Sequence, residues 1–102
     1  MNDRDPAVTV YTTDSCGFCV RAKEYLRRLG VSFAEIDVTG DPVARASLIE
    51  RSRGQHTVPQ IFVRGVHVGG YRDLVALDAA GRFRPLLVAN RGDDYLSRHG
   101  RA

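Results

Sequence analysis

Apolar residues along the chain follow two different spacings, and the order of these spacings predicts the secondary structure. Short β-branched or aromatic runs between polar turns predict strands. Apolar residues three and four positions apart, with charges between them, predict helices. The expected strands are 7–12, 31–38, 59–63 and 66–68, and the expected helices are 18–29, 42–52 and 72–80, with one more turn at 84–88.

Capping and turn residues separate these runs and support their order, β-α-β-α-β-β-α. Asp41 is a suitable N-cap with Pro42 at the first helical position, and Gly30 and Gly81 end helices. A strand-helix-strand unit requires two parallel strands and a right-handed crossover, while the tight connection at Arg64 adds an antiparallel hairpin. The expected fold class is α/β, with a four-stranded mixed β-sheet flanked by helices.

The length and composition are those of one ordinary globular domain. The 102 residues are 43% hydrophobic and 26% charged, which predicts a single domain over 1–102, with a core of about 7–88 and a polar tail over 89–102. No apolar run approaches the ~18 residues of a membrane span. The first six residues carry two acids and no apolar stretch, so we expect no export signal and a cytoplasmic protein without a membrane partner.

The net charge of +3 does not indicate a nucleic-acid partner. The arginines are scattered along the chain, and they accompany neither an aromatic-rich RNA motif nor zinc-finger spacing. We therefore expect no nucleic acid as a partner.

The two cysteines are the most informative residues. Cys16 and Cys19 are separated by two residues, and the chain has no others. A disulfide-stapled secreted domain needs more cysteines, spaced farther apart. A metal site needs further ligands, but the chain has no second CxxC motif and its three histidines include no HxxxH pair. We expect no metal, and a redox-active pair in a reducing compartment.

The position of this pair, between the first strand and the first helix, favours thiol chemistry over inert packing. Unpaired N–H groups and the helix dipole at a helix start stabilise a thiolate. Cys16 is placed there and is the expected nucleophile, since the thiolate attacks in disulfide exchange. Cys19 lies about one turn into the helix, is expected to be the more buried, and suits the resolving role. Helical geometry allows the two to form a disulfide.

Two further segments could hold a ligand. A cis bond between Val58 and Pro59 would leave the main chain of Val58 free to pair with an extended peptide. Gly70 and Asp73, at the start of a helix, would offer free amides and a carboxylate for an amino acid head group. Either segment alone has an ordinary structural explanation, as a strand edge or a turn.

Taken together, three motifs resemble the signatures of glutaredoxins, most closely the small bacterial dithiol members. They are Cys-Gly-Phe-Cys at 16–19, Thr-Val-Pro-Gln-Ile-Phe at 57–62, and His-Val-Gly-Gly-Tyr-Arg-Asp-Leu at 67–74. The resemblance runs from about 8 to 87. It implies a thioredoxin-like fold, a cis Pro59, and glutathione as the reductant and co-substrate.

The resemblance also implies residue roles. Cys16 and Cys19 would form the redox-active disulfide, and Val58 would pair its main chain with the cysteinyl part of glutathione. The rest of the glutathione site would consist of Thr13, Phe18, Thr57, Pro59, Gly70, Tyr71 and Asp73.

Two positions depart from the family pattern. Thr13 stands where many members have a lysine, so an arginine of the second helix could take over its charge. Arg72 stands where an acidic or small polar residue is common.

The expected function is that of a glutathione-dependent thiol–disulfide oxidoreductase. It would reduce protein disulfides and protein–glutathione mixed disulfides as a monomer, with ribonucleotide reductase as a family-level target. One alternative is a carrier of a [2Fe–2S] cluster held by Cys16 and glutathione across a dimer. The other is a redoxin served by thioredoxin reductase, whose members carry a Trp-Ser-Gly-Phe segment; this chain has no tryptophan.

Overall fold

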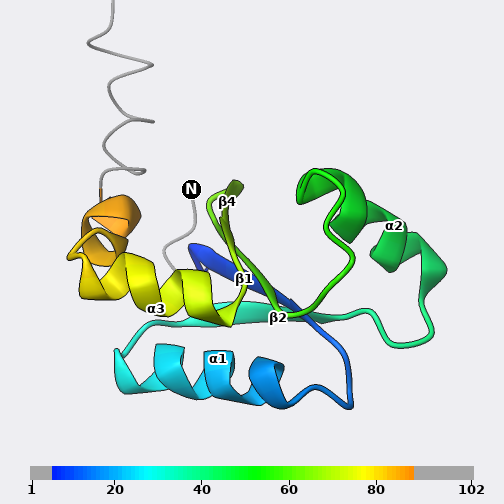
Figure 1. The fold of residues 1–102 in the computed structure, drawn as a ribbon, viewed down its shortest axis with the longest axis horizontal. Coiled ribbons are helices and arrows are strands. Elements are labelled where there is room, and N and C mark those ends of the chain that lie inside the picture. The colour runs from blue at the N-terminus through cyan, green and yellow to red at the C-terminus, as the bar shows by residue number, and fades with distance from the viewer. Residues whose placement is uncertain (1–5, 89–102) are drawn as a thin grey trace, which may run out of the picture.

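The computed structural model describes residues 6–88, which form one sheet with helices on both faces (Figure 1). The predicted tail over 89–102 lies outside the described residues. The elements in chain order are β1 (Val8–Thr12), α1 (Gly17–Arg28), β2 (Phe33–Asp37), α2 (Pro42–Arg51), β3 (Gln60–Val63), β4 (Val66–Gly69) and α3 (Tyr71–Ala79), followed by helical residues 83–88.

The strands lie in the order β2-β1-β3-β4. β1 pairs with β2 in parallel, and the β1–β3 and β3–β4 pairs are antiparallel. The mixed four-stranded sheet expected from the sequence is therefore confirmed. Because β3 runs against β1 and β4 runs against β3, the end of β1, the start of β3 and the end of β4 all meet at one edge of the sheet.

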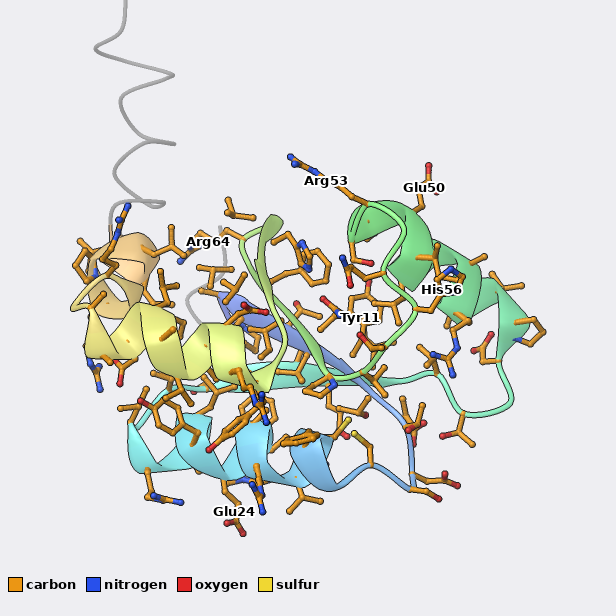
Figure 2. All side chains as sticks on the ribbon, in the orientation of Figure 1. Tyr11, Glu24, Glu50, Arg53, His56 and Arg64 are labelled. Atoms are coloured by element: carbon orange, nitrogen blue, oxygen red, sulfur yellow. The ribbon has the colours of Figure 1, made fainter. Side chains whose placement is uncertain are left out.

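The two faces of the sheet carry separate apolar clusters. On one face α1 and α3 lie side by side (Figure 1) and pack Ala22, Leu26 and Leu74 against β1 and β3. On the other face α2 packs Leu48 against Tyr11 and Phe62. Figure 2 shows Tyr11 between the sheet and α2, whereas Glu24, Glu50 and Arg53 point outward, away from the sheet.

The N-terminus of α2 is capped as its sequence predicts. The Asp41 side chain accepts a hydrogen bond from the Ala44 N–H at 3.0 Å and caps α2, as predicted. The first three strands are shorter than expected, and β2 covers Phe33–Asp37 rather than 31–38, whereas β4 extends one residue beyond the expected 66–68, to Gly69. None of the helices in the described part of the chain is long and apolar enough to cross a membrane.

The helical residues 83–88 contribute more to the core than the sequence indicated. Gly81 has a φ of 74°, a left-handed conformation that suits glycine. The Arg82 N–H donates to the Leu77 carbonyl at 3.0 Å, which folds the chain back after α3. Phe83 is then 0% exposed and is the largest fully buried side chain of residues 6–88. The sequence predicts this turn, but its pattern does not mark Phe83 as a core residue.

Substitution Phe83→Ala is expected to destabilise the fold by about 3–5 kcal/mol, because a buried aromatic leaves a cavity. That is a large part of the ~5–15 kcal/mol of a typical domain. The free energy of unfolding, measured in urea, tests this. Phe83→Leu, which keeps most of the volume, should cost much less. A loss below 1 kcal/mol in the alanine variant would show that residues 83–88 do not belong to the core.

Candidate functional site

Cys16 and Cys19 are presented differently at the start of α1. Cys16 is the N-cap residue, half-buried, and its sulfur accepts a hydrogen bond from the Cys19 N–H at 3.0 Å. The sulfur therefore replaces the usual capping oxygen and lies at the positive end of the helix dipole. This geometry stabilises an anionic sulfur at Cys16.

Cys19 is 1% exposed, on the face of α1 that packs on the sheet. Burial raises the pKa of the Cys19 thiol to about 12; the neighbouring Cys16 acts in the same direction, and a main-chain hydrogen bond from Thr13 and the charge of Lys23 act against it. At neutral pH Cys19 is therefore a protonated thiol. Of the two sulfurs, only Cys16 is both accessible and placed at the start of the helix.

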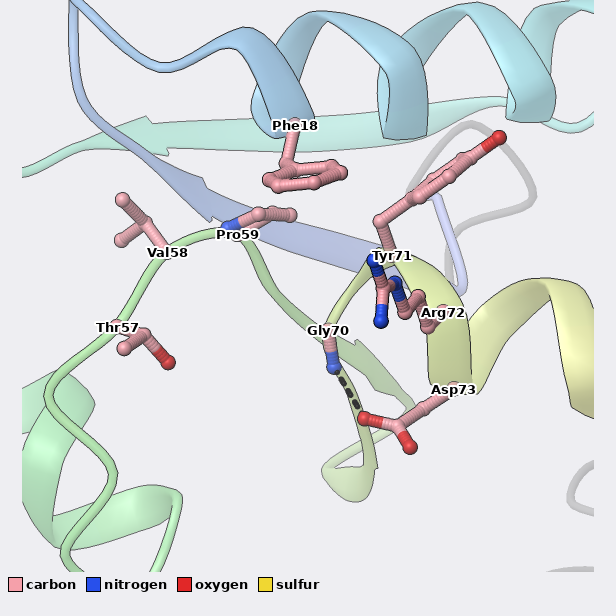
Figure 3. A pocket seen from close by; sticks show the side chains of 8 residues that line it. All are labelled: Phe18, Thr57, Val58, Pro59, Gly70, Tyr71, Arg72 and Asp73. Atoms are coloured by element: carbon pink, nitrogen blue, oxygen red, sulfur yellow. Dashed lines mark hydrogen bonds between the residues drawn. The ribbon is translucent and has the colours of Figure 1, made fainter.

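A pocket of about 330 Å³ lies beside the cysteines (Figure 3). Seven of the eight residues expected to hold glutathione line it, together with Arg72. The lining residues are Phe18, Thr57, Val58, Pro59, Gly70, Tyr71, Arg72 and Asp73. Thr13 does not line the pocket. It directly follows β1, and its main chain hydrogen-bonds the Cys19 side chain.

The main chain of Val58 connects the pocket to the nucleophile. The Val58–Pro59 peptide bond is cis, as the family resemblance implied. The Cys16 thiol donates a weak hydrogen bond to the Val58 carbonyl at 3.5 Å. Among residues 6–88, no group accepts a hydrogen bond from the Val58 N–H. When Cys16 loses its proton it can no longer donate, so both polar groups of Val58 become free to pair with a ligand.

At the α3 end of the pocket one expected amide is already in use. The Gly70 N–H donates to the Asp73 carboxylate at 2.9 Å (Figure 3), so this amide is not free as the sequence suggested. The amides of Tyr71 and Arg72 in the first turn of α3 have no intrahelical acceptor. Asp73 also requires glycine before the helix, since a Cβ at Gly69 would lie 2.4 Å from its carboxylate oxygen.

Aromatic rings form one wall of the pocket. Phe18 and Tyr71 stack with ring centroids 6.0 Å apart, and Tyr25 meets Tyr71 edge to face at 6.3 Å. The Tyr25 hydroxyl donates to Asp78 at 2.5 Å, which ties α1 to α3 behind this wall. Phe18 is 45% exposed, so the wall continues from the pocket onto the outer surface.

Arg45 is a residue that the sequence did not single out. It comes from α2, and its guanidinium donates to the His56 carbonyl at 3.0 Å. His56 precedes Thr57, so the cation lies beside that end of the pocket. The sequence pointed only to some arginine of this helix; choosing one required the path of the loop between α2 and β3.

Comparison with known proteins identifies this arrangement. The family model described as Glutaredoxin matches residues 8–68. The chain belongs to the glutaredoxin family. Glutaredoxins are thiol–disulfide oxidoreductases, and the Cys16–Cys19 pair at the start of α1 supports that activity in this one.

This glutaredoxin aligns with nearly the whole length of several relatives. It is 50% identical to Glutaredoxin of Pseudomonas aeruginosa over 84 residues, 82% of this chain and 99% of that protein. It is 49% identical to Glutaredoxin 3 of Escherichia coli over 80 residues, 78% of this chain and 95% of that protein.

Solved structures agree on the thioredoxin-like fold. The solution structure of glutaredoxin from Brucella melitensis has a TM-score of 0.70 and 46% identity, covering 81% of this chain and 89% of that one. The crystal structure of a buckwheat glutaredoxin–glutathione complex has a TM-score of 0.74 and 28% identity, covering 82% of this chain and 78% of that one.

Alkylation should distinguish the two thiols. With iodoacetamide at pH 7, Cys16 is expected to react long before Cys19, because a pKa of about 12 leaves only about one Cys19 in 10⁵ as thiolate, and the sulfur is buried. Peptide mass spectrometry over time measures both rates. The Cys19 rate, followed in Cys16→Ser, should rise with pH, and it should do so at a lower pH than in the wild type, because Cys16 no longer raises the pKa of Cys19. Equal rates at pH 7 would contradict the assignment.

Proposed function

We propose that this glutaredoxin uses glutathione to reduce protein–glutathione mixed disulfides and protein disulfides. The observation that carries the proposal is the position of the Cys16 sulfur, 3.5 Å from the carbonyl of Val58, a residue that lines a pocket of suitable size. A pocket of about 330 Å³ lies within the range of small-molecule sites. The glutathione complex of the buckwheat protein supports the same ligand.

The charges around the pocket suit the two ends of glutathione. The main chain of Val58 pairs with the cysteinyl unit, which brings its sulfur to Cys16. The free first-turn amides of α3 receive the γ-glutamyl carboxylate, and Asp73 receives the ammonium group. Arg45 and Thr57, at the other end, receive the glycyl carboxylate. Arg45 thereby supplies the cation that position 13 lacks.

Deglutathionylation requires Cys16 alone. Its thiolate attacks the glutathione sulfur of the mixed disulfide, a new bond forms between Cys16 and glutathione, and the target leaves as a thiolate that takes up a proton. A second glutathione, as thiolate, then attacks the bound glutathione sulfur. Oxidised glutathione is released and the Cys16 thiolate is regenerated. One free glutathione is consumed in each cycle: it leaves, joined to the glutathione of the mixed disulfide, as oxidised glutathione, and the target leaves as a thiol.

Reduction of an intramolecular protein disulfide requires both cysteines. The Cys16 thiolate first attacks one sulfur of the target disulfide; the bond between the two target sulfurs breaks, and the other sulfur leaves as a thiolate that takes up a proton. Cys19 then loses its proton and attacks the Cys16 sulfur. The bond between Cys16 and the target breaks, the second target sulfur leaves and takes up a proton, and a Cys16–Cys19 disulfide remains. The hydrogen bond between the Cys19 N–H and the Cys16 sulfur holds the two residues close enough for this step. Two glutathione molecules then reduce that disulfide.

The cysteine variants separate the two reactions. Cys16→Ser is expected to abolish both, whereas Cys19→Ser should retain deglutathionylation and lose the reduction of protein disulfides. The test is turnover with glutathione, NADPH and glutathione reductase, using one glutathionylated and one disulfide-containing protein. Retained turnover in Cys16→Ser would falsify the role of the nucleophile.

Arg45→Ala is expected to raise the KM for a glutathionylated substrate about tenfold, because a hydrogen bond between two charged groups contributes about 1.5 kcal/mol. Arg51→Ala, near the C-terminal end of the same helix, is the matched control, since Arg51 lines a different hollow with Thr9 and Phe62. Steady-state kinetics of both variants decide the question. If the two variants behave alike, Arg45 does not bind the substrate.

A further inference from the structure

A chain of hydrogen bonds leads from the pocket, through the start of β3, to His67 on β4. Gln60, the first residue of β3, is 3% exposed. Its amide nitrogen donates to the Thr57 hydroxyl oxygen at 3.2 Å. Its amide oxygen lies 2.6 Å from Nε2 of His67 on β4. Gln60 therefore connects a residue that lines the pocket with a histidine that does not.

The direction of these hydrogen bonds follows from what each atom can do. An amide oxygen only accepts, so Nε2 of His67 carries the hydrogen. Burial, together with the charge of Arg53, lowers the pKa of His67 and outweighs Asp73, which acts against them. The neutral ring has one N–H, and the bond to Gln60 places it on Nε2. With the oxygen of Gln60 committed to His67, its nitrogen is directed toward Thr57.

The orientation of the Gln60 amide determines what the Thr57 hydroxyl can do. Its oxygen accepts the hydrogen bond from Gln60, and within the described chain this is its only partner. A hydroxyl has a single hydrogen and orients it to suit its surroundings. Since Gln60 donates to this oxygen, the hydrogen of Thr57 stays available to the pocket that Thr57 lines (Figure 3).

We propose that His67 is a positioning residue for glutathione binding: acting through Gln60, it holds the Thr57 hydroxyl as a hydrogen-bond donor toward an oxygen of the glutathionyl group. The inference rests on the proposed function, because it concerns the same pocket. It goes beyond that function by assigning a role to two residues, Gln60 and His67, that do not touch the ligand.

The opposite arrangement shows why the identity of residue 67 matters. If Nε2 of His67 had no hydrogen, the Gln60 amide would turn over and donate to it. The Gln60 oxygen would then face Thr57 and accept its hydroxyl hydrogen, and Thr57 would only accept from the ligand. A carboxylate or carbonyl of glutathione has no hydrogen to give. A donor at the position of Nε2 is therefore what the pocket requires.

The ring of His67 also has a packing role, from which the positioning role must be separated. It lies 4.9 Å from the ring of Phe62, at an angle of 30°, and these two residues are partners in the β3–β4 register. Loss of this ring contact would affect stability in any variant without the ring. The test must therefore compare variants that lose the ring equally.

His67→Gln and His67→Asn form such a pair. Both remove the ring, but the amide nitrogen of glutamine reaches the place of Nε2, whereas that of asparagine reaches only the place of Nδ1. The substrate is the mixed disulfide of glutathione and cysteine, with glutathione reductase as the coupling enzyme. We expect H67N to raise its KM about three- to tenfold, the range for one neutral hydrogen bond, with kcat nearly unchanged. H67Q should retain the wild-type KM.

A double-mutant cycle then tests the path of the effect. Thr57→Val removes the hydroxyl from an exposed position and should raise the KM by a similar factor. If His67 acts through Thr57, H67N should cause no further rise in the Thr57→Val background. Val66→Thr, at an exposed position beside His67, should leave the KM unchanged.

The outcomes separate this inference from the proposed function. Alkylation of Cys16 by iodoacetamide, which does not require the pocket, should proceed equally in wild type and H67N; a parallel loss of alkylation would indicate general disruption and overturn the inference. Equal KM values for H67N and H67Q, or additive effects in the cycle, would also overturn it. If the wild-type protein does not turn over the glutathione mixed disulfide, the proposed function itself fails.

Discussion

The hydrogen bond from the Cys19 amide to the Cys16 sulfur is the interaction on which the rest of the site depends. It places one sulfur at the N-cap of α1, where the helix stabilises negative charge. The same helix buries Cys19, Ala22 and Leu26 against the sheet. Core packing therefore keeps one thiol neutral and hidden, while capping places the other at the accessible start of the helix. The division of labour between the two cysteines follows from their places on one helix.

The order of strands explains why three distant segments form one pocket. The end of β1, the start of β3 and the end of β4 meet at the same edge of the sheet. The loops there carry Cys16, Val58 and Gly70, which lie far apart in the sequence. Each loop contributes a different group: a sulfur, a main-chain N–H without an acceptor among residues 6–88, and the start of a helix. The sheet keeps them at a fixed separation without contributing a catalytic side chain of its own.

Much of this arrangement could be predicted from local sequence. The spacing of apolar residues predicted every strand and helix, and the CxxC position identified the two sulfurs, because capping and burial on one helix are local properties. Other features depend on how separate segments meet. Arg45 requires the path of the loop after α2, and the Gln60–His67 contact requires the β3–β4 register, with its irregularity between Ile61 and Phe62.

The α3 end of the pocket shows a second limit of sequence reasoning. Gly70 and Asp73 were both expected to face a ligand, but they bond to each other. A carboxylate at the third position of a helix commonly reaches back to the N-cap amide. The motif was therefore identified correctly, while the partners of its individual atoms depended on competition within the motif itself.

The burial of Phe83 has a consequence for where this folding unit ends. The family match spans residues 8–68, yet the apolar cluster under α1 and α3 includes Leu74 and Phe83. A fragment cut to the matched segment would lack α3, and with it Asp73 and half of the pocket wall. It would also expose to solvent the apolar surface of the sheet that Phe83 covers. Transplanting this redox centre into another protein therefore means carrying the chain past Phe83.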